Sequence, residues 1–125
     1  IDNFLSKHDV YSNIWHMDSH DGNRMIRIFV LLTSVTDSDG PLYYLDREGT
    51  KKNWDKLRER WTFDKKYSDY EYSEQKILTG EKGDYLLINT SSSAHRASIP
   101  ENFRDILAVT LYPSWRKHKE RKLYI

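Results

Sequence analysis

The longest apolar run of the chain constrains its fold most strongly. Residues 25–32 read MIRIFVLL and are rich in β-branched residues. The polar stretch that follows ends in the turn residues Asp39, Gly40 and Pro41. A short apolar run bounded by turn residues is typical of a strand. We therefore expect a strand over 25–32 and a neighbouring strand over 42–45 (LYYL).

Two further runs near the C-terminal end have the same character. Residues 83–90 (GDYLLINT) begin with Gly-Asp, and residues 105–113 (DILAVTLYP) end at a proline. We expect them to form a second strand pair. The polar residues 91–103 between them show no periodicity, so they are expected to form a loop.

The middle of the chain, at about residues 46–76, has a different pattern. Trp54, Leu57 and Trp61 recur at the spacing of one helix face, with charged residues around them. This spacing predicts one short amphipathic helix, followed by a charged, tyrosine-rich inserted loop. Because strands dominate and no regular alternation of strands and helices is present, the pattern favours an antiparallel sandwich or barrel.

Composition excludes several functional classes. The 20 basic and 19 acidic residues nearly cancel, so no net field draws the chain to nucleic acid or to a membrane. There is no cysteine, which excludes disulfides, thiolate metal sites and cysteine nucleophiles. No stretch approaches the roughly 20 apolar residues that a membrane span requires, and no signal peptide is visible. A cytoplasmic location fits these features.

The length of 125 residues indicates a single domain over 1–125. Because the first residue is isoleucine, we expect a processed or excised piece of a longer chain. The C-terminal tail at 116–122 is basic. We expect this tail to be solvated, with a phosphate-binding or partner-binding patch as the alternative.

Residues 15–20 read WHMDSH and include three possible metal ligands, His16, Asp18 and His20. On a strand all three side chains would point to one face, because side chains alternate. Each two-residue step advances about 6.6 Å, whereas the ligand atoms of one metal ion lie only about 3 Å apart. One straight strand can therefore supply two ligands to an ion, but not three.

The third ligand must come from elsewhere, and the remaining histidines are His8, His95 and His118. His95 is best placed, because an antiparallel sheet could bring it beside His16. Two histidines and one carboxylate leave one face of an octahedral ion open, as in ferrous oxygenases. Nitrogen and oxygen donors without thiolate suit iron or manganese better than a closed zinc site. Arg104 could pair bidentately with the carboxylate of a co-substrate.

The segments WHMD at 15–18, SDGPLYYL at 38–45 and GDYLLINT at 83–90 occur in a fixed order with AHRASIPENFRDILAVTLYPSW at 94–115. This set resembles the phytanoyl-CoA dioxygenase group of iron(II)/2-oxoglutarate oxygenases. The resemblance covers more than half of the chain. His-x-Asp alone is common by chance, whereas the ordered set is far more specific.

The resemblance implies a mainly β chain folded as a double-stranded β-helix (a jelly-roll, cupin-like fold) with one short inserted helix. It implies that His16, Asp18 and His95 are the catalytic Fe(II) ligands, and that Arg104 binds the far carboxylate of 2-oxoglutarate. The implied reaction uses dioxygen to hydroxylate or otherwise oxidise a C–H bond of a small-molecule substrate. Succinate and CO2 are released. The sequence does not indicate the substrate or the oligomeric state, and no nucleic-acid or membrane partner is expected.

The chain departs from the family pattern at two places. Residues 45–48 (LDRE) replace a Pro-Gly-Ser-His stretch, and Ala97 replaces a serine that often helps to hold 2-oxoglutarate. Family members are also usually much longer. The prolyl-hydroxylase-like branch shares the same order of motifs but more often uses lysine as the anchor.

Two other functions remain open, namely a non-catalytic jelly-roll binding module and a metal-dependent cupin-like enzyme that does not use 2-oxoglutarate. The pair His16 and Asp18 could also be purely structural. His20 is expected at the rim of the site. Arg27 is expected to face solvent, with a substrate carboxylate as the alternative partner.

Overall fold

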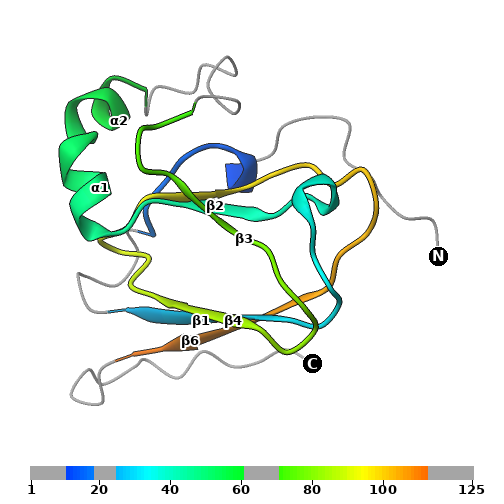
Figure 1. The fold of residues 1–125 in the computed structure, drawn as a ribbon. Helices are drawn as coiled ribbons and strands as arrows, with labels where there is room; N and C mark the ends of the chain where they lie inside the picture. The colour runs from blue at the N-terminus through cyan, green and yellow to red at the C-terminus, as the bar shows by residue number, and fades with distance from the viewer. Residues whose placement is uncertain (1–10, 19–24, 61–70, 113–125) are drawn as a thin grey trace.

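The chain is mainly β, with two antiparallel sheets and a few short helices (Figure 1). The computed structural model describes residues 11–18, 25–60 and 71–112. The first sheet has the order β4-β1-β6, formed by Tyr85–Ile88, Ile26–Leu31 and Ile106–Leu111. The second has the order β3-β2-β5, formed by Lys76–Leu78, Leu42–Tyr44 and His95–Ala97. The basic tail at 116–122 lies outside the described residues.

The strands expected from the apolar runs are all present, but two of the expected pairings are wrong. β1 and β2 lie in different sheets, and β4 and β6 flank β1 instead of pairing with each other. The link from β1 to β2 contains the 3-10 turn η2 (Asp37–Asp39) and Gly40 in the left-handed region at φ 70°. This link is too long for a two-residue hairpin turn, so it can carry the chain from one sheet to the other.

The prediction of a continuous loop over 91–103 is also wrong, because β5 lies within it. β5 has only three residues and pairs antiparallel with β2, with Tyr44 opposite His95 and Leu42 opposite Ala97. A strand of this length is too short to show a period of two in the sequence. Its formation depends on a partner that is distant in the chain.

The two sheets enclose the main core. Along β1 the buried side chains Phe29 and Leu31 alternate with more exposed ones, as a half-buried strand requires. The main core cluster draws on both sheets and consists of Phe29, Leu31, Val35, Leu42, Leu78 and Ile88. The outward face of the first sheet is also apolar, and it carries the exposed side chains of Ile26, Tyr85, Leu87, Leu107, Val109 and Leu111. Within the described residues, this sheet therefore buries only one of its faces.

The expected single helix is two short helices, α1 (Arg47–Lys52) and α2 (Trp54–Arg60). They lie at one end of the sheets (Figure 1). α1 ends at Asn53, whose backbone N–H and side-chain Nδ2 both donate to the Gly49 carbonyl, at 3.1 Å and 2.8 Å. Of the expected helix face, Leu57 is buried, while Trp54 is exposed.

A second core cluster contains Trp15, Leu45, Leu57, Tyr72 and Ala94. It joins α2 to the segment before the first sheet, and Met17 packs against it. The expected charged loop is described only from residue 71, where Tyr72 is buried. Trp61 lies outside the described residues. None of the described helices is long and apolar enough to cross a membrane.

Candidate metal centre

His16 and Asp18 lie on an extended segment that pairs with the start of β5. The segment is not a full strand, because its only ladder contact is an isolated antiparallel bridge between His16 and His95. In that bridge the His16 N–H donates to the His95 carbonyl at 3.0 Å, and the His95 N–H donates back at 2.9 Å. The Asp18 N–H donates to the Thr90 carbonyl at 2.9 Å. These bonds bring residues almost eighty positions apart to one place.

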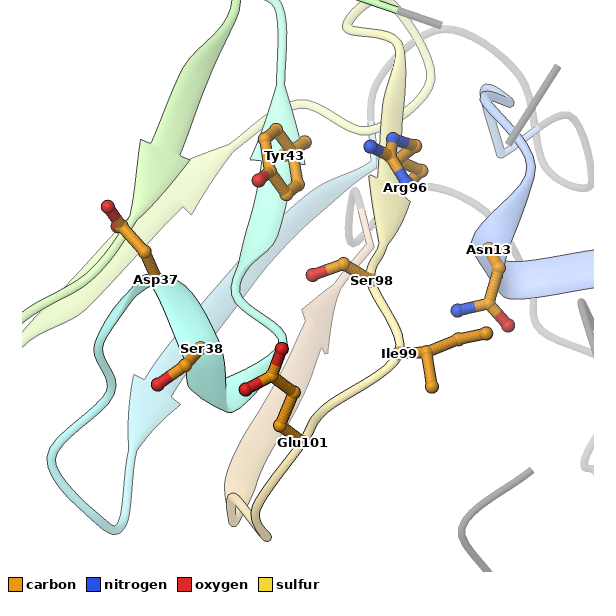
Figure 2. Close-up of a pocket in the computed structure, with 8 residues that line it drawn as sticks. All are labelled: Asn13, Asp37, Ser38, Tyr43, Arg96, Ser98, Ile99 and Glu101. Atoms are coloured by element: carbon orange, nitrogen blue, oxygen red, sulfur yellow. The ribbon is translucent and has the colours of Figure 1, made fainter. Parts of the chain in front are cut away.

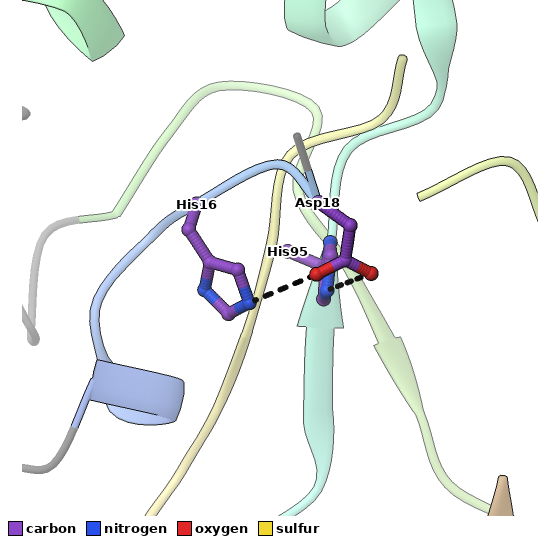
Figure 3. Close-up of side chains that lie close together, drawn as sticks. All are labelled: His16, Asp18 and His95. Carbon is purple, nitrogen blue, oxygen red and sulfur yellow. Dashed lines mark ion pairs between the residues drawn. The ribbon is translucent and has the colours of Figure 1, made fainter. Parts of the chain in front are cut away.

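The three side chains converge (Figure 3). One possible ligand atom from each of His16, Asp18 and His95 lies within 4.8 Å of the others. Each histidine Nε2 is 3.8 Å from an oxygen of Asp18, Oδ1 for His16 and Oδ2 for His95. Neighbouring ligands on one side of an ion, with bonds near 2.1 Å, are about 3 Å apart. A small inward rotation of these side chains would therefore give metal-binding distances.

The backbone fixes which ring nitrogen faces the centre of the cluster. Nδ1 of His16 lies 2.7 Å from the Ile14 carbonyl, and Nδ1 of His95 lies 3.1 Å from the Ser93 carbonyl. A carbonyl only accepts, so each Nδ1 carries a hydrogen, and in the neutral ring Nε2 presents its lone pair. Each Nε2 thus lies 3.8 Å from an oxygen of the Asp18 carboxylate, which is too long for a hydrogen bond. This arrangement is typical of ligands held for a cation.

Burial keeps His95 in the form that binds a metal. The pKa of His95 is lowered to about 4, chiefly by loss of hydration and next by the neighbouring His16. The Ser93 carbonyl and Asp18 oppose this shift. At neutral pH the His95 ring is therefore uncharged and can offer Nε2 to an ion without first losing a proton.

Arg27 faces the cluster, so the expectation that it faces solvent is wrong. It lies on β1 in phase with the buried Phe29 and Leu31, and its Nη1 is 3.3 Å from Oδ2 of Asp18. The sequence could not reveal this phase, because both faces of β1 carry apolar residues. The ion pair gives Oδ2 of Asp18 a cationic neighbour, although this oxygen is buried without a hydrogen-bond partner among the described residues.

Arg104 lies at the other end of the β1–β6 ladder from Arg27. It comes two residues before β6, whose first residue Ile106 is opposite Leu31, whereas Arg27 is opposite Thr110. Arg104 is half-buried, and this burial lowers its pKa. Its Nη1 is buried without a hydrogen-bond partner among residues 11–18, 25–60 and 71–112. Among the described residues, no hydrogen bond or ion pair joins Arg104 to the three clustered side chains.

Two cavities lie near the cluster, and no clustered side chain lines either of them. The larger is about 580 Å³ and adjoins Met17, the residue between the two N-terminal candidates. The smaller is about 280 Å³ and includes Tyr43 of β2 and Arg96 of β5 (Figure 2). Arg96 is buried, with its guanidinium carbon 4.5 Å from the centroid of the Tyr43 ring and 5.8 Å from that of Trp15. The smaller cavity therefore contains a cation that already stacks on aromatic rings.

No family model matches the chain, and no curated protein matches it. The alternative ligands His8, His20 and His118 lie outside the described residues. Of the predicted site residues, the structure brings together His16, Asp18 and His95, and leaves Arg104 apart. The sequence did not predict the ion pair between Arg27 and Asp18.

Proposed function

We propose that the chain is an iron(II)/2-oxoglutarate-dependent oxygenase that oxidises a C–H bond of a small molecule. The observation that carries this proposal is the convergence of two backbone-oriented Nε2 atoms and the Asp18 carboxylate. Three nitrogen and oxygen ligands on one side of an ion leave positions for a co-substrate and dioxygen. The donor set contains no thiolate and fits iron(II).

The order of the strands supports a jelly-roll as the finer description of the fold. The chain passes from the first sheet (β1) to the second (β2 and β3), back to the first (β4), and then to β5 and β6 in turn. A double-stranded β-helix winds between two sheets in this manner. The same winding puts the start of β5, and with it His95, beside the segment that carries His16 and Asp18.

Each residue has a separate task in the proposed site. His16 and His95 would bind the metal through Nε2, with their rings oriented by the carbonyls of Ile14 and Ser93. Asp18 would bind it through a carboxylate oxygen, while the ion pair with Arg27 helps to orient the carboxylate. When bound, iron and 2-oxoglutarate would supply the oxidation of the substrate by dioxygen, with release of succinate and CO2.

Arg104 would pair with the far carboxylate of 2-oxoglutarate. Its buried Nη1 has no hydrogen-bond partner in the described part of the chain, and an unpaired buried donor of this kind is costly unless an anion satisfies it. 2-Oxoglutarate would supply that anion, provided that the long Arg104 side chain extends from its end of the ladder toward the clustered ligands. The guanidinium fork suits a carboxylate better than a lysine ammonium does.

The test is an anaerobic titration of the full chain with Fe(II) and 2-oxoglutarate, followed through the visible charge-transfer band of the chelate. We expect a band that is lost in His95→Ala and weakened in Arg104→Ala, with Arg58→Ala as the matched exposed-arginine control. Succinate release should then require both iron and 2-oxoglutarate. Iron binding without a band would refute the role of 2-oxoglutarate, and absence of iron binding would refute the metal site.

A metal-dependent cupin-like enzyme that does not use 2-oxoglutarate is the second candidate. The separation of Arg104 from the clustered ligands along β1 favours it. This candidate predicts metal-dependent oxidation of a substrate at a rate that Arg104→Ala leaves unchanged.

A further inference from the structure

The larger cavity lies directly beside the ligand segment. Its volume is about 580 Å³, within the range of sites for small organic molecules. One wall is Met17, which stands between His16 and Asp18. A second wall is the 89–92 stretch, which is tied to the ligand segment by the bond from the Asp18 N–H to the Thr90 carbonyl.

The wall formed by α1 carries two cations one helical turn apart. Arg47 and Lys51 both line the cavity and are exposed, and neither makes an ion pair with another described residue. Like charges at positions i and i+4 repel each other and destabilise a helix unless an anion lies between them. The nearby Asp46 does not neutralise them, because it caps α1 through the Gly49 N–H and pairs with Lys76. This wall is therefore positively charged.

The remaining walls combine apolar surface with hydroxyl groups. Trp54, at the start of α2, is 37% exposed and lines the cavity together with Met17. Ser91 also lines it, and its Oγ is buried without a hydrogen-bond partner in the described part of the chain. An unsatisfied buried hydroxyl is costly when no ligand satisfies it, and the exposed indole offers apolar surface to a ligand. Together they form a site with a charged end and an apolar end.

We propose that this cavity binds a small anionic molecule with an apolar body. A carboxylate or phosphate head would pair with Arg47 and Lys51, and Ser91 would donate a hydrogen bond to it. The apolar body would lie against Trp54 and Met17. The smaller cavity is a weaker candidate, because Asp37, Glu101 and Arg96 give it both signs of charge, and Arg96 is already stacked on Tyr43.

The bound molecule would be the substrate of the proposed oxygenase, and this role rests on that proposed function. The binding itself does not, because the cavity is formed by side chains outside the metal cluster. The two parts can therefore fail separately.

Binding is tested in the metal-free chain by tryptophan fluorescence and calorimetry with three probes: 4-phenylbutyrate, phenyl phosphate and the uncharged 4-phenylbutanol. We expect the anions to bind and the alcohol to bind at least about tenfold more weakly, since each charge-assisted hydrogen bond contributes about 1.5–3 kcal/mol. The stronger of the two anions identifies the head group. Equal binding of the alcohol would overturn the proposal.

The double variant Arg47→Glu/Lys51→Glu should weaken anion binding by about tenfold or more. The matched control is Lys56→Glu/Arg58→Glu, which changes the net charge equally on exposed residues that do not line the cavity. If the first double variant misfolds by circular dichroism, Arg47→Gln/Lys51→Gln replaces it. Equal losses in both double variants would indicate a non-specific charge effect and overturn the site.

The substrate role is tested with Co(II) as an air-stable spectroscopic probe of the metal cluster. A bound anion that changes the visible Co(II) spectrum in the wild type, but not in Arg47→Glu/Lys51→Glu, supports it. An anion that binds without any spectral change refutes the substrate role. Anion binding in a chain that binds no Co(II) refutes the metal site and leaves the anion site standing.

Discussion

Replacing His95 by glutamine should remove most of the stabilisation that a divalent metal gives the fold. An ion that binds only the folded chain stabilises it by about 2.7 kcal/mol when its free concentration is 100 times its Kd. For a chain of this size, 1 kcal/mol corresponds to a few degrees in Tm. Saturating Co(II) should therefore raise the Tm of the wild type by roughly ten degrees.

The expected loss follows from the position of His95 in the cluster. Its Nε2 is one of three converging ligand atoms, so its removal should lower metal affinity at least as much as the loss of an outer hydrogen-bonding partner does, which is about 10–100-fold. A 100-fold loss reduces the stabilisation at the same Co(II) concentration to about 0.4 kcal/mol. Calorimetric melts with and without Co(II) measure the difference directly.

His20→Gln is the matched control, because His20 also belongs to the WHMDSH motif but was predicted not to be a ligand. Its Co(II)-dependent shift should equal that of the wild type. The reasoning is refuted if His95→Gln keeps the full shift or if the wild type shows none. A loss confined to His20→Gln would place the third ligand outside the observed cluster.

Three further predictions concern the fold around the site. Gly40→Ala should lower the free energy of unfolding by at least about 2 kcal/mol in urea titrations, because Gly40 has φ 70° and an added Cβ would lie 2.6 Å from the Pro100 nitrogen; an unchanged midpoint would contradict this. Asp46→Ala should cost about 1 kcal/mol through loss of the α1 cap, whereas Glu48→Ala, on the same helix without the cap bond, should cost less. In the metal-free chain, the free energy of unfolding should fall as the pH drops from about 6.5 to about 4, because His95 has a pKa of about 4 in the folded chain and the unfolded chain takes up the proton first. His95→Gln should lack this part of the pH dependence. Identical pH profiles in the wild type and in His95→Gln would refute this contribution of His95.

The strands were predictable where composition alone decides them. The apolar runs that became β1, β2, β4 and β6 are bounded by turn residues, and each forms a strand within one or two residues of the expected limits. Their pairing was not predictable, because it depends on contacts between residues far apart in the chain. The turn chemistry at residues 37–41 is equally compatible with a hairpin and with a crossing between sheets. The observed crossing becomes clear only when β2 is seen to pair with β3 and β5.

The proximity of His16, Asp18 and His95 was predictable for a different reason. The limit of two ligands from one straight segment is a matter of distance, and it holds although residues 14–18 form only one bridge and no full strand. That limit required a distant third ligand, and the position of His95 between two strands made it the best candidate. The role of Arg27 was not predictable, because Ile26, Ile28 and Val30 are as apolar as Phe29 and Leu31. The phase of β1 is set by which face packs on the second sheet.

The short strand β5 connects the fold to the proposed chemistry. Its first residue, His95, pairs with Tyr44 of β2 on one side and with His16 on the other. The backbone of β5 thus orients the ligand segment, while its first side chain completes the cluster.

A substitution that weakens β5 without touching a ligand should therefore lower metal affinity as well as stability. The bond from the Ser98 hydroxyl to the Pro41 carbonyl, at 2.7 Å, ties the end of β5 to the start of β2. Ser98→Ala should reduce both quantities, whereas Ser34→Ala, which removes an exposed hydroxyl bonded to Glu81, should reduce neither by a comparable amount. Full Co(II) affinity in a destabilised Ser98→Ala chain would show that β5 does not orient the ligands.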